Sequence, residues 1–147
     1  LQNNKVRTVV RHAAWIHSVD SASLLKRIDR IAGEEGVCPK VLMQINIAGE
    51  KSKFGVNPEI IHDLAGMACE YKNVDCRGLM TILPYGLPSE ALFRLFSAVA
   101  ALRESIQILL NDPLPDLSMG MSGDFHEAIA AGATLVRIGS AIFGDRP

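Results

Sequence analysis

The strict alternation of short apolar runs with helical patterns constrains this chain more than any other feature. Strands are predicted over Trp15–Val19, Val41–Ala48, Arg77–Ile82, Leu117–Met121 and Leu135–Ile138. Helical patterns separate these runs, and a loop leading into a helix precedes the first. Such alternation predicts an α/β fold with a parallel sheet covered by helices. Doubly wound sheets and barrels both fit. No GxGxxG follows any of the runs, which disfavours a dinucleotide-binding fold.

Helix boundaries follow from capping residues and from the spacing of apolar residues. The helices are predicted over 21–32, with Asp20 or Ser21 as the cap, and over 58–71, 89–110 and 124–131. In the last helix, Asp124 and Glu127 have the spacing of a capping box. The residues predicted at helical spacing on the inward faces are Leu24, Ile28, Ile31, Ala32, Ile61, Leu64, Ala65, Ala68, Cys69, Leu92, Phe96, Val99, Arg103 and Ile106.

Small residues occupy the turns after the last two predicted strands. Ser122-Gly123 follows one strand, and Gly139-Ser140 follows the other. Small residues let backbone N–H groups approach a phosphate, and a helix start adds a favourable partial charge. In parallel folds such sites lie at the carboxyl ends of strands. The two turns therefore predict a phosphate site, although two ordinary strand-to-helix turns would show the same residues.

Three polar side chains interrupt the apolar runs. Arg137 is flanked by apolar residues, and a buried guanidinium is costly unless it is paired and hydrogen-bonded. It needs an acceptor from a ligand or from a carboxylate on another strand, and a structural ion pair fits equally well. Gln44 and Asn46 share one side of their strand. Asn46, nearer the carboxyl end, is the better candidate ligand, and Gln44 is assigned a structural role.

Composition and residue spacing give no indication of a nucleic-acid partner, a membrane partner or a zinc site. The formal net charge of −1 does not suggest a nucleic-acid or membrane partner, and no apolar run approaches the ~20 residues of a membrane span. Cys38, Cys69 and Cys76 are odd in number and lack CxxC spacing, as expected of reduced thiols in a cytoplasmic protein. The histidines form no HxH or HExxH pattern, which disfavours a zinc site.

Five motifs occur in an order shared with a known family. They are LQNNK at Leu1–Lys5, HSVDS at His17–Ser21, QINIAGEKSKFG at Gln44–Gly55, RGLMTI at Arg77–Ile82 and LSMGMSGDFHEAIAAGATLVRIGSAIFG at Leu117–Gly144. On these motifs the chain resembles the pyridoxal phosphate homeostasis protein family over essentially its whole length. The resemblance implies a (β/α)8 TIM-type barrel of the alanine racemase N-terminal domain type. It also implies pyridoxal 5′-phosphate (PLP) as the cofactor.

The resemblance extends residue by residue to a cofactor site. It matches the family's phosphate contacts to Ser122, the backbone of Gly123, Gly139 and Ser140, its arginine at the pyridine nitrogen to Arg137, and two positions lining the pocket to Asn46 and Met80. These assignments agree with the phosphate site predicted from the two small-residue turns.

The family's Schiff-base lysine has no match in this sequence. The resemblance places it near the end of a first strand upstream of Leu1. Residues 1–147 would then be the C-terminal portion of a single barrel domain, roughly strands four to eight. Lys5, Lys51 and Lys53 belong to other motifs, and loop lysines such as the last two are usually only solvated. Five strands without closure leave two unpaired sheet edges, so the isolated chain is not expected to be a stable monomer.

The resemblance implies a carrier or regulator in intracellular PLP homeostasis rather than a catalyst, with PLP-dependent apoenzymes as candidate recipients. A guanidinium at the pyridine nitrogen stays charged and accepts no proton, so it weakens PLP as an electron sink. A PLP-dependent amino-acid racemase is one alternative, for which the sequence offers no obvious second catalytic base. A truncated remnant that binds no PLP and has an interaction role is another. Oligomeric state does not follow from the sequence.

Overall fold

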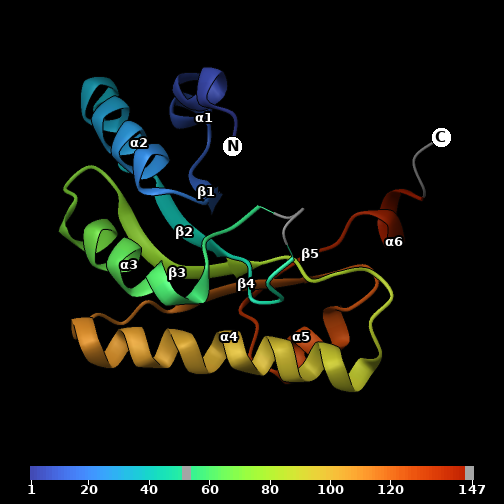
Figure 1. Ribbon diagram of the computed structural model, residues 1–147. Coiled ribbons are helices and arrows are strands. Elements are labelled where there is room, and N and C mark those ends of the chain that lie inside the picture. The colour runs from blue at the N-terminus through green and yellow to red at the C-terminus, as the bar shows by residue number, and fades with distance from the viewer. Residues whose placement is uncertain (51–53, 145–147) are drawn as a thin grey trace.

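Five parallel strands form one curved sheet with helices along its outer side (Figure 1). The computed structural model describes residues 1–50 and 54–144. The strands lie in sequence order and are β1 Trp15–Val19, β2 Lys40–Ile45, β3 Asp75–Thr81, β4 Asp116–Met121 and β5 Leu135–Arg137. Sequential order means that every connection joins neighbouring strands, and connections of one hand then place their helices on one face. This arrangement is a half-barrel, not a doubly wound sheet.

The helices lie where the apolar spacing predicts them. They are α1 Val6–His12, α2 Ala22–Glu35, α3 Ile61–Glu70, α4 Ser89–Leu110, α5 Phe125–Ala130 and α6 Ser140–Phe143, with short 3₁₀ turns η1 Asn3–Lys5 and η2 Pro58–Ile60. Ser21 caps α2, because its hydroxyl accepts a hydrogen bond from the Leu24 amide at 3.3 Å. No helix in the described part of the chain has both the length and the apolar character needed to cross a membrane.

A hydrophobic core fills the space between the sheet and the outer helices. Its fully buried side chains include Leu25, Ile28, Ile31, Met43, Ile45, Ile61, Leu79, Phe96, Ile106 and Leu117. The predicted inward residues of the helices belong to this core, with two exceptions that are only partly buried. Cys69 lies at its margin, and the Arg103 Nη1 group donates to the Pro115 carbonyl at 3.2 Å.

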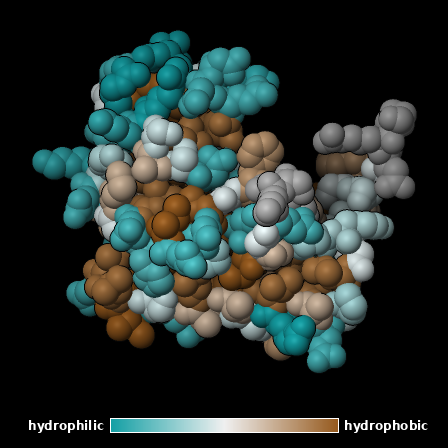
Figure 2. Space-filling view, viewed as in Figure 1, coloured by the Kyte–Doolittle hydropathy of each residue, from teal (hydrophilic) through white to brown (hydrophobic). Residues whose placement is uncertain are grey.

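The outer surface is uneven in polarity. Hydrophilic side chains gather over α1 and α2, whereas hydrophobic side chains are visible around the end of α4 (Figure 2). Ile108 and Leu109, near that end of α4, are 84% and 66% exposed. Not every large apolar side chain of α4 is therefore buried beneath the helix.

Two local predictions are wrong. The strand predicted to reach Ala48 ends at Ile45, because the Asn46 amide bonds the Val56 carbonyl and the chain leaves the sheet. The capping box does not form. The Asp124 carboxylate accepts from the Met121 amide at 2.6 Å, and Glu127 accepts from the Ser89 hydroxyl at 2.6 Å. The Glu127 carboxylate therefore bonds the Ser89 hydroxyl of α4, although the local spacing predicted that it would cap α5.

Candidate functional site

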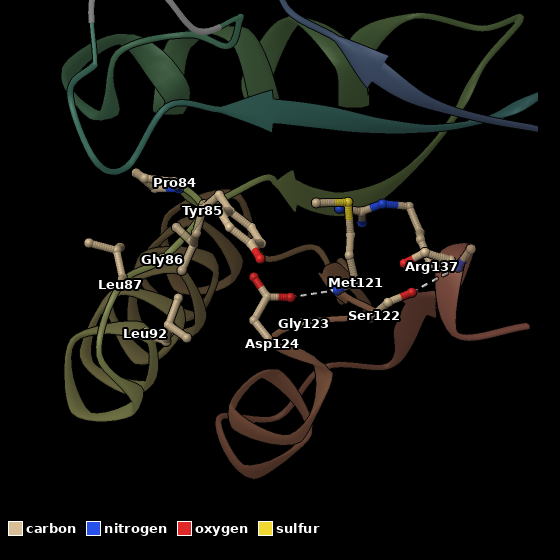
Figure 3. Close-up of a pocket in the computed structure, with 13 residues that line it drawn as sticks. Pro84, Tyr85, Gly86, Leu87, Leu92, Met121, Ser122, Gly123, Asp124 and Arg137 are labelled. Carbon is tan, nitrogen blue, oxygen red and sulfur yellow. Dashed lines mark hydrogen bonds between the residues drawn. The ribbon is translucent and has the colours of Figure 1, made fainter. Parts of the chain in front are cut away.

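A cavity of about 510 Å³ opens at the carboxyl ends of β3, β4 and β5 (Figure 3). Its walls are the 83–87 segment after β3, Leu92 of α4, the 121–124 segment at the end of β4, Arg137 at the end of β5, and Gly139 and Ser140 just after it. The volume is in the range of small-molecule sites, roughly 300–1,000 Å³. The carboxyl ends of parallel strands are also where α/β folds bind ligands.

The structure brings five of the seven predicted site residues together. Ser122, Gly123, Arg137, Gly139 and Ser140 all line this cavity. They come from two separate strand ends, which confirms that the two small-residue turns meet at one place. A Cβ atom built on Gly123 or Gly139 would meet no atom within 4 Å, so the backbone of both turns faces open space.

The remaining predicted contacts lie elsewhere or outside the described residues. Met80 is buried on β3, beside Ser118 in the sheet register, and does not line the cavity. The Asn46 side chain donates to the Glu50 carbonyl at 2.7 Å and holds the segment after β2. The assignment of Met80 and Asn46 to the cofactor site stays a prediction. Lys51 and Lys53 lie outside the described residues.

The hydroxyl of Ser122 ties the two turns together. It accepts a hydrogen bond from the backbone amide of Gly139 at 3.2 Å (Figure 3) and another from the amide of Ala141, also at 3.2 Å. The first turn is fixed in addition by the bond from the Met121 amide to Asp124. The two turns therefore form one wall of the cavity, and the amides at the start of α6 converge on that wall.

Arg137 brings a positive charge to the cavity, and its hydrogen-bond acceptors are uncharged groups. Its Nη1 group donates to the Ser118 hydroxyl at 2.6 Å, and its Nη2 group donates to the Thr81 carbonyl at 2.9 Å. Among the described residues it forms no salt bridge, so the structural ion pair left open by the sequence is not what the structure shows. Burial lowers the pKa of Arg137 and Asp124 raises it, but a guanidinium remains charged in proteins.

His17 and Ser118 are parts of this site that sequence reasoning missed. Ser118 is fully buried on β4, and its hydroxyl lies 2.8 Å from Nδ1 of His17 on β1. Burial lowers the pKa of His17, and the charge of Arg137 lowers it further, whereas Asp116 raises it. A serine inside an apolar run and a histidine in a predicted strand were the available signals, but their proximity depends on the sheet.

Gly120 allows β4 to approach α5 closely beside the first turn. Its φ is +91°, and a Cβ atom there would lie 2.6 Å from Cβ of Ala128 and 3.0 Å from Cα of Phe125. Residues other than glycine rarely adopt such a φ, and the contact leaves no room for a side chain. Glycine at this position therefore sets the path of the chain into the Ser122 turn.

Comparison with known proteins relates the whole chain to one family. The model of the family described as "Alanine racemase, N-terminal domain" matches residues 1–147. The pyridoxal phosphate homeostasis proteins of Aquifex aeolicus and Synechocystis sp. are 42% and 43% identical over 146 and 147 residues. Each alignment covers 99% of this chain, and the chain spans 64% and 67% of the length of those relatives.

A solved structure supports the same relationship. PipY of Synechococcus elongatus, in a structure with PLP bound, is 39% identical and superposes with a TM-score of 0.91. The superposition covers 98% of this chain and 67% of that one. The half-barrel described above is thus similar in both sequence and fold to part of a longer PLP-binding protein.

Proposed function

This chain belongs to the alanine racemase N-terminal domain family and, within it, to the pyridoxal phosphate homeostasis proteins, and on that premise we propose that it binds PLP at the cavity. The observation that carries the proposal is the convergence of two small-residue turns and a half-buried arginine on one cavity. The residues form the C-terminal portion of a single PLP-binding barrel domain. Covalent attachment of PLP to a lysine is assigned to no residue of 1–147.

The residues of the cavity suit the two ends of PLP. A phosphate at the joined turns would meet the backbone of Gly123, Gly139 and Ser140, where the two cavity glycines open to free space. Bonds from amides to a charged phosphate are roughly twice as strong as neutral ones. Ser122 already gathers two amides there and would either share them with the phosphate or yield them to it.

Arg137 faces the pyridine nitrogen in this proposal. When bound, PLP supplies a reactive aldehyde and an electron-withdrawing ring. Arg137 donates hydrogen bonds and accepts none, so it leaves the ring nitrogen unprotonated. The acceptors of Arg137 are a hydroxyl and a carbonyl, and its positive charge is therefore not neutralised by a bonded carboxylate.

The first test compares two arginines in equilibrium titrations with PLP. Arg137→Met should weaken PLP binding about 10- to 100-fold, since a hydrogen bond to a charged group is lost. Arg103→Met is the matched control, because Arg103 is also partly buried and bonds a carbonyl, but it does not line the cavity. Equal affinities for the wild type and Arg137→Met would contradict the proposed site.

A second titration tests the phosphate wall. Pyridoxal, which lacks the phosphate, should bind more weakly than PLP, and inorganic phosphate should compete with PLP. Ser140→Asp would place a carboxylate beside the phosphate and should reduce the preference for PLP over pyridoxal. Equal binding of PLP and pyridoxal would place the recognition of PLP elsewhere in the protein.

The role that follows is a carrier or regulator of PLP that sequesters its aldehyde and passes it to PLP-dependent apoenzymes. A guanidinium at the ring nitrogen disfavours chemistry that needs a strong electron sink. Hydrogen exchange at the α-carbon of alanine in deuterium oxide tests this role. No exchange dependent on the protein is expected. Exchange that requires both the protein and PLP would favour a racemase.

A further inference from the structure

A chain of hydrogen bonds runs across the inner face of the sheet from β1 to β5. His17 Nδ1 lies 2.8 Å from the Ser118 hydroxyl, and that hydroxyl lies 2.6 Å from Nη1 of Arg137. His17 is 101 residues from Ser118 in sequence. Three strands thus contribute one polar side chain each, and the last of the three lines the cavity.

The direction of each proton in this chain follows from the chemistry of the groups. Arg137 can only donate, so Ser118 Oγ is the acceptor of that bond. The single hydroxyl proton of Ser118 then needs an acceptor of its own. Ser118 is fully buried, and His17 Nδ1 is the acceptor within reach that the described residues provide. Nδ1 accepts only if the imidazole is neutral and carries its proton on Nε2.

We propose that His17 is a positioning residue for PLP binding: as a neutral imidazole protonated on Nε2, it accepts the Ser118 proton and so leaves the Ser118 oxygen to orient the Arg137 guanidinium at the cavity. The proposal rests on the proposed function of Arg137 as the partner of the pyridine nitrogen. His17 touches no ligand in this account and acts only through Ser118.

The surroundings of His17 favour the neutral form. Burial is the main cause of the lowered pKa of His17; Arg137 on β5 lowers this pKa further, and Asp116 on β4 acts in the opposite direction. Asp116 is itself paired with Arg77 on β3 at 2.9 Å. On β2, Lys40 lies over the ring of Trp15, which contacts His17 edge-on at 5.8 Å between ring centres. Arg77 and Lys40 thus each have another partner, in Asp116 and Trp15, whereas Arg137 acts directly on His17.

The tautomer of His17 can be measured without any ligand. Long-range ¹H–¹⁵N correlation spectra of the ¹⁵N-histidine-labelled protein at pH 7.5 should show His17 protonated on Nε2 alone. The signal is assigned by its loss in His17→Asn. A His17 ring protonated on Nδ1, or on both nitrogens, at this pH would overturn the proposal whether or not the protein binds PLP.

Variants then test the link to PLP. His17→Phe and Ser118→Ala should each weaken PLP binding about three- to tenfold, and the double variant should be no weaker than the worse single one, since both break one chain. His17→Asn should stay within about twofold of wild type, because its side-chain oxygen can accept in place of Nδ1. Additive losses, or a His17→Asn protein as weak as His17→Phe, would contradict the mechanism.

A second histidine–serine pair provides the matched control. His62 Nε2 lies 3.0 Å from the Ser105 hydroxyl on the exposed outer surface. His62→Phe should leave PLP affinity unchanged. If His17→Phe does not fold, Ser118→Ala and the tautomer spectrum still decide the question. If the wild type fails to bind PLP, the proposed function fails, and the spectrum alone judges the position of the proton.

The pH dependence separates positioning from mere packing. Burial and Arg137 lower the pKa of His17 below its usual 6.5. As pH falls through that lowered pKa, the ring gains a proton on Nδ1 and stops accepting from Ser118. PLP affinity of the wild type should therefore fall relative to His17→Asn as pH is lowered from 7.5 through the pH at which the His17 ring titrates, which the same ¹⁵N spectra locate. Free PLP titrates identically in both experiments, so a ratio that stays constant through the titration of His17 would contradict the proposal.

Discussion

The outer and inner faces of the five-stranded sheet differ in what holds their side chains in place. On the outer face, aliphatic residues such as Met43, Leu79 and Leu117 pack beneath the helices in one continuous cluster. On the inner face, Leu42 and Met80 are also buried but do not belong to that cluster. The polar chain from His17 through Ser118 to Arg137 crosses this second face.

On the proposed function, stability and ligand recognition are divided between the two faces. Apolar contacts are not directional, so many combinations of aliphatic residues satisfy the outer face. Hydrogen bonds have required directions, and a buried group left unbonded is costly. Substitutions on the outer face should therefore change the free energy of unfolding, and those on the inner face should change PLP affinity.

The largest expected effect concerns the isolated 147-residue chain. β1 pairs only with β2 and β5 only with β4, so both edges of the described sheet are open and the inner face has no opposite wall. Such edges promote association. Sedimentation should therefore show self-association. A compact monomer of 15.9 kDa that melts cooperatively would show that the outer face alone suffices for stability.

Phe96→Ala is expected to have the largest effect on the outer face. Phe96 is fully buried on α4, and its removal should lower the free energy of unfolding by about 3–5 kcal/mol. Phe93, on the same helix and 44% exposed, is the control, and its replacement by Ala should cost about 1 kcal/mol or less. Urea titrations give both values. PLP affinity of the folded Phe96→Ala protein should be unchanged.

Gly120→Ala tests the junction between the two faces. The positive φ and the contact with Ala128 should together cost about 1–3 kcal/mol and displace the Ser122 turn, which weakens PLP binding. Gly132→Ala is the control, since Gly132 has φ +94° but no atom within 4 Å of an added Cβ. Urea titration and PLP titration of both variants should show a smaller loss for Gly132→Ala. Equal losses of stability and PLP affinity in the two variants would show that the close approach of Gly120 to Ala128 is not the cause of the effect.

The smallest expected effects on stability compare the Ser21 cap, which forms at α2, with the capping box predicted at α5, which does not form. Ser21→Ala removes the cap of α2 and should cost about 1 kcal/mol. Glu127→Ala should cost less, because Glu127 caps no helix and accepts a hydrogen bond from the Ser89 hydroxyl instead. Thermal melts of the two variants give the comparison. A greater loss for Glu127→Ala would indicate that the capping box forms in solution.

Local patterns were sufficient for most of the outer face. The helix predicted from Ser89 to Leu110 has those bounds in the structure, and the strand predicted at Trp15–Val19 is also unchanged. Both depend on periodicity within a single segment. Glu127 shows the limit of such reasoning, because its partner Ser89 lies 38 residues away and no local spacing could reveal it.

The candidate site could be predicted in part. Both small-residue turns were identified because each follows a strand, and Arg137 because it is a charged residue inside an apolar run. The hydrogen-bond acceptors of Arg137 could not be identified from the sequence, because strand order and register bring Ser118 and Thr81 to it. His17 was missed for the same reason.

A structure of the protein with PLP bound would test the central claim most directly. The phosphate should contact the turns at Ser122-Gly123 and Gly139-Ser140, and the pyridine nitrogen should lie beside the Arg137 guanidinium. PLP bound away from this cavity, or with its phosphate away from both turns, would contradict the account.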